Sequence, residues 1–226
     1  LQDNSSYYPG GAISSSGPLT IRNSDLRRNS AQLGSGGAIS ASDSLTVEHS
    51  TFSENSARTV DGSGGAIQAT TALVRNCAFV GNSAGGGGGA ILAQGSLTVA
   101  NSTFENNVAG YGGAIGSSGP VSIGNSRFTG NSATARGGGA VSANGSLNVV
   151  GSTFDRNSAQ GSGGALFLSR WALSHNIVGT RFLRNLAWQG GGAVYNDGGA
   201  ARIENSLFVD NRSNRGGAVL SYGSLD

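Results

Sequence analysis

The sequence contains no lysine, no methionine and a single cysteine, Cys77, among its 226 residues. One cysteine excludes an intrachain disulfide framework and a zinc site built from cysteine pairs. The basic residues are 14 arginines that stand singly against 12 acidic residues, so the clustered positive charge typical of a nucleic-acid-binding protein is missing. Because even an initiator methionine is lacking, we expect the chain to be a processed or excised piece of a longer protein.

Long apolar runs and long helix-forming runs are missing as well. No apolar run approaches the roughly 20 residues needed to span a bilayer, and residues 1–4 lack the basic and apolar form of a signal peptide. The 40 glycines disfavour helices, while their irregular spacing and the presence of only 3 prolines exclude collagen. We therefore expect neither a transmembrane segment nor a helical domain in this chain.

Two tetrapeptides recur through the whole chain. Gly-Gly-Ala followed by Ile, Val or Leu occurs nine times at intervals of 24 to 28 residues, with the alanine at positions 12, 38, 66, 90, 114, 140, 165, 193 and 218. Phe-x-x-Asn alternates with it, beginning at positions 52, 79, 104, 128, 154, 182 and 208, and Leu26-x-x-Asn29 is an altered first copy. The residue five places before each of these Phe residues, or before Leu26, is always Ile or Val. Such self-similarity indicates a repeat architecture.

Apolar and polar residues alternate around the β-branched position, which predicts short strands with one buried face. A period near 25 residues with three strand signals per repeat is typical of a β-solenoid, in which a single coil cannot bury its apolar face alone. We predict an all-β fold in which residues 1–226 form a single right-handed parallel β-helix of about nine coils and three parallel sheets. Flanking coils or caps are expected in the parent protein to cover the end coils.

The asparagine of the second tetrapeptide stands once in every repeat. In stacked coils, a buried amide can accept a hydrogen bond from one coil and donate one to the next. We therefore predict an internal ladder that satisfies polar groups of the turns, formed by Asn29, Asn55, Asn82, Asn107, Asn131, Asn157, Asn185 and Asn211.

Paired Gly-Gly-Ala-[Ile/Leu/Val] and Phe-x-x-Asn tetrapeptides are the signature of the chlamydial polymorphic membrane proteins, and the chain resembles their repeat region over essentially its whole length. The resemblance implies an extracellular, cell-surface passenger domain that is carried by a C-terminal outer-membrane β-barrel and acts in adhesion to host cells. It also implies a contribution of the tetrapeptides to adhesion, here at positions such as 88–91 and 104–107. The absence of lysine and the single cysteine point to another lineage. The expected partner is a host or other surface protein, or a glycan.

Parallel β-helices also include polysaccharide lyases and glycosidases, so a carbohydrate-active β-helix with its chemistry mostly outside this chain is the alternative function. Those activities need clustered carboxylates, whereas the acidic residues here are dispersed. Aligned repeats place Arg28 next to Glu54 and Arg184 next to Asp210, which favours charge pairs on a solvated sheet. We predict a non-enzymatic rod with no catalytic residue, no cofactor and no metal site.

Two of the three isolated residues with reactive side chains fit structural roles. His49 occupies a turn position that asparagine mostly fills, and Cys77 takes a small inward site that is serine in most repeats. His175 falls in the longest repeat, where the pattern does not fix its direction.

The C-terminal third is the candidate site. The outward position two residues after the Gly-Gly-Ala alanine is serine in several early repeats and becomes Phe167, Tyr195 and Leu220 in the last three. The only two tryptophans lie in neighbouring repeats there. We predict a contact surface for a partner protein or a sugar ring, formed by Phe167, Arg170, Trp171, Trp188 and Tyr195. The alternative is a local lid in which Trp171 folds back over Phe167 and Tyr195.

A third interpretation is ice binding by an outward threonine column. The column begins with Thr20 and Thr46 but continues as Leu73, Thr98, Ser122, Asn148 and Asn176, so it loses its regularity halfway.

Overall fold

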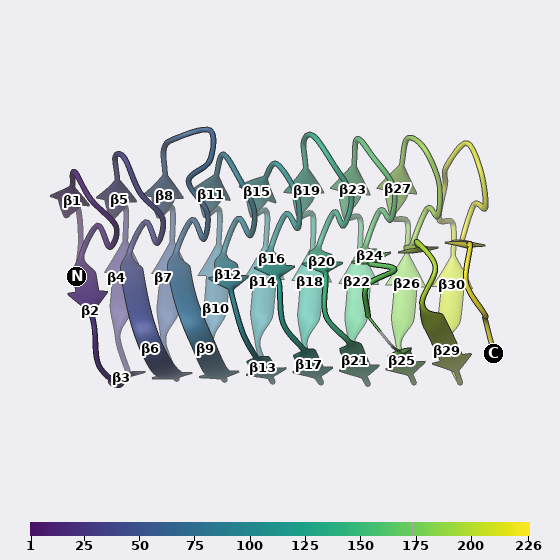
Figure 1. Cartoon of the computed structure of the whole chain (residues 1–226), viewed down its shortest axis with the longest axis horizontal. Coiled ribbons are helices and arrows are strands. Elements are labelled where there is room, and N and C mark those ends of the chain that lie inside the picture. Colours follow the sequence, from purple (N-terminus) through teal and green to yellow (C-terminus); the bar gives the residue numbers. More distant parts are fainter. Residues whose placement is uncertain (173) are drawn as a thin grey trace.

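The computed structural model describes residues 1–172 and 174–226 and shows a rod of stacked coils, with the two termini at opposite ends (Figure 1). The described strands form three sheets of 8, 8 and 15 members without any helix. Each strand pairs in parallel with the equivalent strand of the next coil. The predicted all-β parallel solenoid with three sheets is confirmed, and the 8-stranded sheets give about eight turns, close to the nine coils predicted.

The largest sheet, called the broad sheet below, holds two strand segments from every coil except the last, which contributes β31 alone. The strands that begin after Gly-Gly-Ala are β2 (Ile13–Ser15), β12 (Ile91–Ala93), β16 (Ile115–Ser117), β20 (Val141–Ala143), β24 (Leu166–Leu168), β28 (Val194–Asn196) and β31 (Val219–Ser221). The strands that follow them are β3 (Leu19–Arg22), β13 (Leu97–Ala100), β17 (Val121–Gly124), β21 (Leu147–Val150), β25 (Ser174–Val178) and β29 (Ala200–Glu204). In two early coils both strands are continuous, as β6 (Ile39–Glu48) and β9 (Ile67–Arg75).

The second sheet, the Phe sheet, is centred on the phenylalanine column. Its strands are β4 (Asp25–Arg27), β7 (Thr51–Ser53), β10 (Ala78–Val80), β14 (Thr103–Glu105), β18 (Arg127–Thr129), β22 (Thr153–Asp155), β26 (Arg181–Leu183) and β30 (Leu207–Val209). Phe79 lies beside Phe52 on one side and Phe104 on the other, so like residues stand over like residues.

The third sheet, the Ser-Ala sheet, consists of two-residue strands that the three predicted strand signals do not include. They are β1 (Ser5–Ser6), β5 (Ser30–Ala31), β8 (Ser56–Ala57), β11 (Ser83–Ala84), β15 (Val108–Ala109), β19 (Ser132–Ala133), β23 (Ser158–Ala159) and β27 (Leu186–Ala187). Each follows a ladder position and most read Ser-Ala, with the alanine inside the coil. Two residues are too few to show the alternation that marks a strand in a sequence.

The corners of the coil explain the glycine and asparagine content. The first glycine of every Gly-Gly-Ala has a φ between 55° and 81°, the left-handed region that favours glycine. The second glycine needs to lack a side chain, since a Cβ on Gly37 would clash with the Gly65 carbonyl oxygen of the next coil. Between the broad and Phe sheets, Asn76 and Asn101 have φ values of 53° and 50°. His49 stands at the same corner with φ 50°, which confirms its turn role.

The core is built from columns of identical side chains. The rings from Phe52 to Phe182 are at most 1% exposed and stack with centroids 4.7 to 5.2 Å apart. This distance matches the spacing of hydrogen-bonded strands, so the rings stack because the backbone repeats. Leu26 fills the same column in an early coil and is fully buried. Cys77 is buried in its predicted inward site, where its thiol donates to the Arg75 carbonyl oxygen at 3.1 Å.

The predicted asparagine ladder is present and runs through the interior. Asn82 Nδ2 donates to Asn107 Oδ1 at 3.0 Å and to the Phe52 carbonyl oxygen at 2.9 Å. Asn82 Oδ1 accepts from the side chain and the backbone N–H of Asn55 at 2.9 and 3.0 Å. Each internal amide thus has all its groups in hydrogen bonds, which is what a buried polar side chain requires.

The ladder also has a rung that the sequence pattern missed. Asn4 Nδ2 donates to Asn29 Oδ1 at 2.8 Å, and the Leu1 carbonyl oxygen accepts from Asn29 Nδ2 at 3.1 Å. Leu1-x-x-Asn4 is therefore a further altered copy of the second tetrapeptide, equivalent to Leu26-x-x-Asn29.

Candidate interaction surface

An aromatic stack lies on the outer face of the Gly-Gly-Ala strands in the last coils. Phe167 on β24 and Tyr195 on β28 are direct neighbours in the broad sheet, and their rings stack with centroids 5.3 Å apart. Tyr222 meets Tyr195 edge-on, with a centroid distance of 5.9 Å. Phe167 and Tyr195 are half-buried. Each ring therefore keeps part of its surface open to solvent.

Arg170 is joined to this stack through an acidic residue. Its Nε donates to Asp197 Oδ2 at 2.8 Å, and the Tyr195 hydroxyl donates to Asp197 Oδ1 at 3.2 Å. Burial, followed by the Asp197 carboxylate, raises the pKa of the Tyr195 phenol, so the hydroxyl keeps its proton and stays a donor. The hydrogen bond with Asp197 likewise raises the pKa of Arg170. The structure thus brings together three of the five predicted contact residues.

The two tryptophans lie in the loops that flank the strands of this stack. Trp171 follows β24 and is 82% exposed, while Trp188 follows β27, ahead of β28, and is 65% exposed. Neither indole stacks on another aromatic ring within the described residues. The alternative in which Trp171 folds back as a lid is wrong, because a lid would hide most of its ring. The two indoles instead project into solvent from neighbouring coils.

A groove next to the aromatic stack is lined partly by residues outside the predicted contact surface. It has a volume of about 470 Å³, and its lining includes Tyr111, Arg136, Asn144, Phe167, Gln189 and Tyr195. Phe167 and Tyr195 come from strands, Asn144 comes from the turn after β20, and the other three residues come from loops between the Ser-Ala and broad sheets. The loops vary in length between repeats, so columns read from the sequence do not align them.

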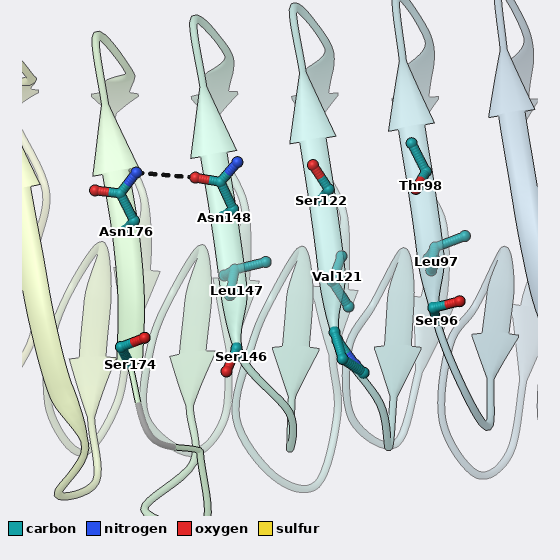
Figure 2. A pocket seen from close by; sticks show the side chains of 11 residues that line it. Ser96, Leu97, Thr98, Val121, Ser122, Ser146, Leu147, Asn148, Ser174 and Asn176 are labelled. Carbon is teal, nitrogen blue, oxygen red and sulfur yellow. Dashed lines mark hydrogen bonds between the residues drawn. The ribbon is translucent and has the colours of Figure 1, made fainter.

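A second hollow, of about 300 Å³, lies on the part of the broad sheet that β13, β17, β21 and β25 form (Figure 2). Figure 2 shows Thr98, Ser122, Asn148 and Asn176 in one row across neighbouring coils, with a hydrogen bond of 2.9 Å between the two asparagines. The register confirms that these residues form one column. All four side chains are polar and uncharged.

The charged residues form pairs, but not all the predicted ones. Arg28 Nε and Nη2 donate to the two carboxylate oxygens of Asp3 at 2.6 and 2.7 Å, instead of pairing with Glu54. Glu54 pairs with Arg27 at 3.2 Å. The Arg28 hydrogen bond lowers the pKa of Asp3. The Arg28 side chain extends to the preceding coil because the Asp3 carboxylate there accepts two hydrogen bonds from the guanidinium group.

Arg184 makes the same two-armed contact. Its Nε and Nη2 donate to the two oxygens of Asp155 at 3.0 and 2.9 Å, so the predicted pairing with Asp210 is wrong. The Asp155 carboxylate is buried and also lies 3.3 Å from Arg156 Nε and 3.9 Å from Arg127 Nη2. Its oxygens are occupied by arginines, which gives it a structural role in the Phe sheet rather than that of a free catalytic acid.

His175 points into the core, which the sequence left undecided. It is 2% exposed and stands beside Leu147 in the inward column of the broad sheet. Its Nε2 lies 3.3 Å from the Ser169 carbonyl oxygen, while Nδ1 has no hydrogen-bond partner in the part of the chain that the structure describes. Burial lowers the pKa of His175, which favours the neutral ring with its proton on Nε2.

Two further observations concern the described residues as a whole. They contain no group of three His, Cys, Asp or Glu side chains placed to hold a metal ion. No helix with the length and apolar character of a membrane span occurs among them.

Comparison with protein families agrees with this geometry. Residues 3–104 match the right-handed β-helix region, and residues 101–118 and 151–169 match the Chlamydia polymorphic membrane protein repeat. The chain is a β-helix domain with polymorphic-membrane-protein-type repeats. Each match to the polymorphic membrane protein repeat contains one Phe-x-x-Asn and the Gly-Gly-Ala strand that follows it. In these two segments, the matched repeat spans a Phe-sheet strand, a Ser-Ala strand and the Gly-Gly-Ala strand of one stacked unit. No curated protein and no solved structure matched the chain.

Proposed function

We propose that the chain is a non-enzymatic, passenger-like rod of a cell-surface protein, exposed outside the cell and adhesive in role. The polymorphic-membrane-protein-type repeat and the β-helix fold fit an autotransporter-like passenger. Support for adhesion comes from one observation, the exposure of Trp171 and Trp188 around the stack of Phe167 and Tyr195. The partner is a surface protein or a glycan.

Exposed indoles favour an interaction role for physical reasons. A large apolar ring in water gains free energy when a partner covers it, and its N–H can still reach a hydrogen-bond acceptor. Tryptophan and arginine are also the residues that most often dominate binding energy at protein interfaces. Arg170 is held in place by Asp197 and lies one residue before Trp171. A rigid coil thus presents a cation and an indole together.

Adhesion of beads coated with the purified chain tests this function. Beads are applied to cultured epithelial cells and to immobilised glycans, with beads carrying bovine serum albumin as the control. We expect retention well above the control on at least one surface. Incubation with a panel of polysaccharides tests the enzymatic alternative, and cleavage of any of them without adhesion would overturn the proposal.

A further inference from the structure

The groove lined by Tyr111 and Tyr195 forms because small residues separate larger ones on the outer face of the broad sheet. Ser142 on β20 follows Gly116 on β16 in this column, and the next member is Phe167. The Phe167 ring lies over Gly137, where a Cβ would clash with it. Ser142 thus forms a low floor beside the aromatic wall of Phe167, while the Tyr111 ring lies close to Gly116.

Two guanidinium groups border this part of the surface. Arg136 lines the groove itself, and Arg215 lines an adjoining hollow that shares Gln189 and Tyr195 with it. Both arginines are exposed, and neither forms an ion pair with a carboxylate of the described residues. The nearby Asp197 is already bonded to Arg170 and to the Tyr195 hydroxyl. Positive charge therefore remains available to a ligand in the groove.

The backbone around the groove leaves no edge for an extended peptide. The floor strands β16, β20, β24 and β28 pair with one another in register. In the wall, the Gly161 N–H donates to the Arg136 carbonyl oxygen and the Gln189 N–H donates to the Gly161 carbonyl oxygen, both at 3.1 Å. Recognition of a peptide by strand addition requires a free sheet edge, whereas these floor strands lie side by side within the broad sheet. We therefore look to the side chains of the groove for ligand contacts.

We propose that this groove binds an acidic oligosaccharide. Half-open faces of Phe167, Tyr195 and Tyr111 suit the C–H faces of sugar rings, because an aromatic face is the negative end of its quadrupole. The exposed amides of Asn144 and Gln189 both donate and accept hydrogen bonds, which suits hydroxyl groups. The Arg136 guanidinium group has paired N–H donors that can bind two oxygens of a carboxylate or sulfate. The proposal deepens the proposed function, on which it rests, by naming the class of ligand.

Binding to pairs of oligosaccharides that differ only in charge tests the proposal. The probes are tetragalacturonate, a heparin tetrasaccharide and a sialylated tetrasaccharide, each beside its methyl-esterified, desulfated or asialo counterpart, measured by isothermal titration calorimetry. We expect at least one acidic probe to bind about tenfold or more tightly than its neutral form. Equal binding within every pair, or no binding by any probe, would overturn the proposal.

Variants separate the groove from the tryptophan surface. We expect Arg136→Gln to weaken binding of the acidic probe about tenfold, and Phe167→Ala to weaken the acidic and neutral probes alike. Arg75→Gln is the matched control, since Arg75 is exposed at another corner and also lacks an ion pair among the described residues. Equal affinities of Arg136→Gln and Arg75→Gln would refute the groove. Adhesion that needs Trp171 and Trp188 would still support the proposed function in that case, so the two failures are distinguishable.

Discussion

Asn82 and Asn107 are 25 residues apart in the chain and are joined by a hydrogen bond of 3.0 Å between their side-chain amides. The separation equals one repeat, so each sequence repeat forms one coil. Asn107 Nδ2 in turn donates to Asn131 Oδ1 at 2.9 Å. The ladder makes each coil depend on its neighbours for the hydrogen bonds of its interior, as expected for a repeat architecture.

Removal of a central rung is predicted to destabilise the rod strongly. Asn107→Ala removes the acceptor for the Asn82 backbone N–H and for one Asn82 Nδ2 hydrogen, and it removes a donor to the Phe79 carbonyl oxygen, all inside the core. At about 1–3 kcal/mol for each buried unpaired group, partly relieved by local shifts, we expect a loss of about 3–5 kcal/mol. Chemical denaturation measures it. The control Asn148→Ala removes an exposed amide with one side-chain hydrogen bond and is expected to change stability by less than about 0.5 kcal/mol. Equal effects of the two substitutions would contradict the ladder's role.

Stability is predicted to fall on acidification because of His175. A buried neutral ring with a lowered pKa contributes full stability above about 6.5, the ordinary pKa of histidine. As the pH falls below that value, the unfolded chain binds a proton first, and stability is lost down to the folded-state pKa. His175→Leu matches the neighbouring Leu147 and should remove this part of the pH dependence. Thermal unfolding between pH 7.5 and 5 checks it, and the same loss of stability in His175→Leu and in the wild type would contradict the prediction.

His49→Asn is predicted to stabilise the fold. His49 has φ 50°, a left-handed conformation that asparagine adopts more readily and that asparagine holds at the same corner at Asn76 and Asn101. We expect a gain of about 0.5 kcal/mol, seen as a higher midpoint in urea. His49→Val, which introduces a β-branched residue at positive φ, should lower the midpoint instead. A midpoint unchanged in both variants would show that the corner tolerates any residue.

The columns of the core could be predicted because they depend on fixed distances along the chain. Phe52, Phe79 and Phe104 fall into one column once the repeat is aligned, and the backbone register then stacks their rings. The Ser-Ala strands were missed because two residues give no alternation. Asn4 was missed because leucine replaces phenylalanine at Leu1, although Leu26 carries the same replacement.

The surface could be predicted only in part, because side-chain directions decide it. The outward column placed Phe167 beside Tyr195, and the structure stacks them. The column did not show that Arg28 turns to the preceding coil, since the choice between Asp3 and Glu54 depends on the reach of a long side chain. The groove depends on Tyr111 and Arg136, which lie in loops of unequal length where alignment by columns ends.

The interaction role of the C-terminal coils is tested most directly by bead adhesion of two double variants. Trp171→Ala/Trp188→Ala removes the exposed indoles, and Tyr7→Ala/Tyr8→Ala removes a pair of rings that are 60% and 71% exposed near the other end of the rod. We predict that the tryptophan variant loses adhesion about thirtyfold while the tyrosine variant adheres like the wild type. Wild-type adhesion by the tryptophan variant, or the same loss in both, would contradict the account.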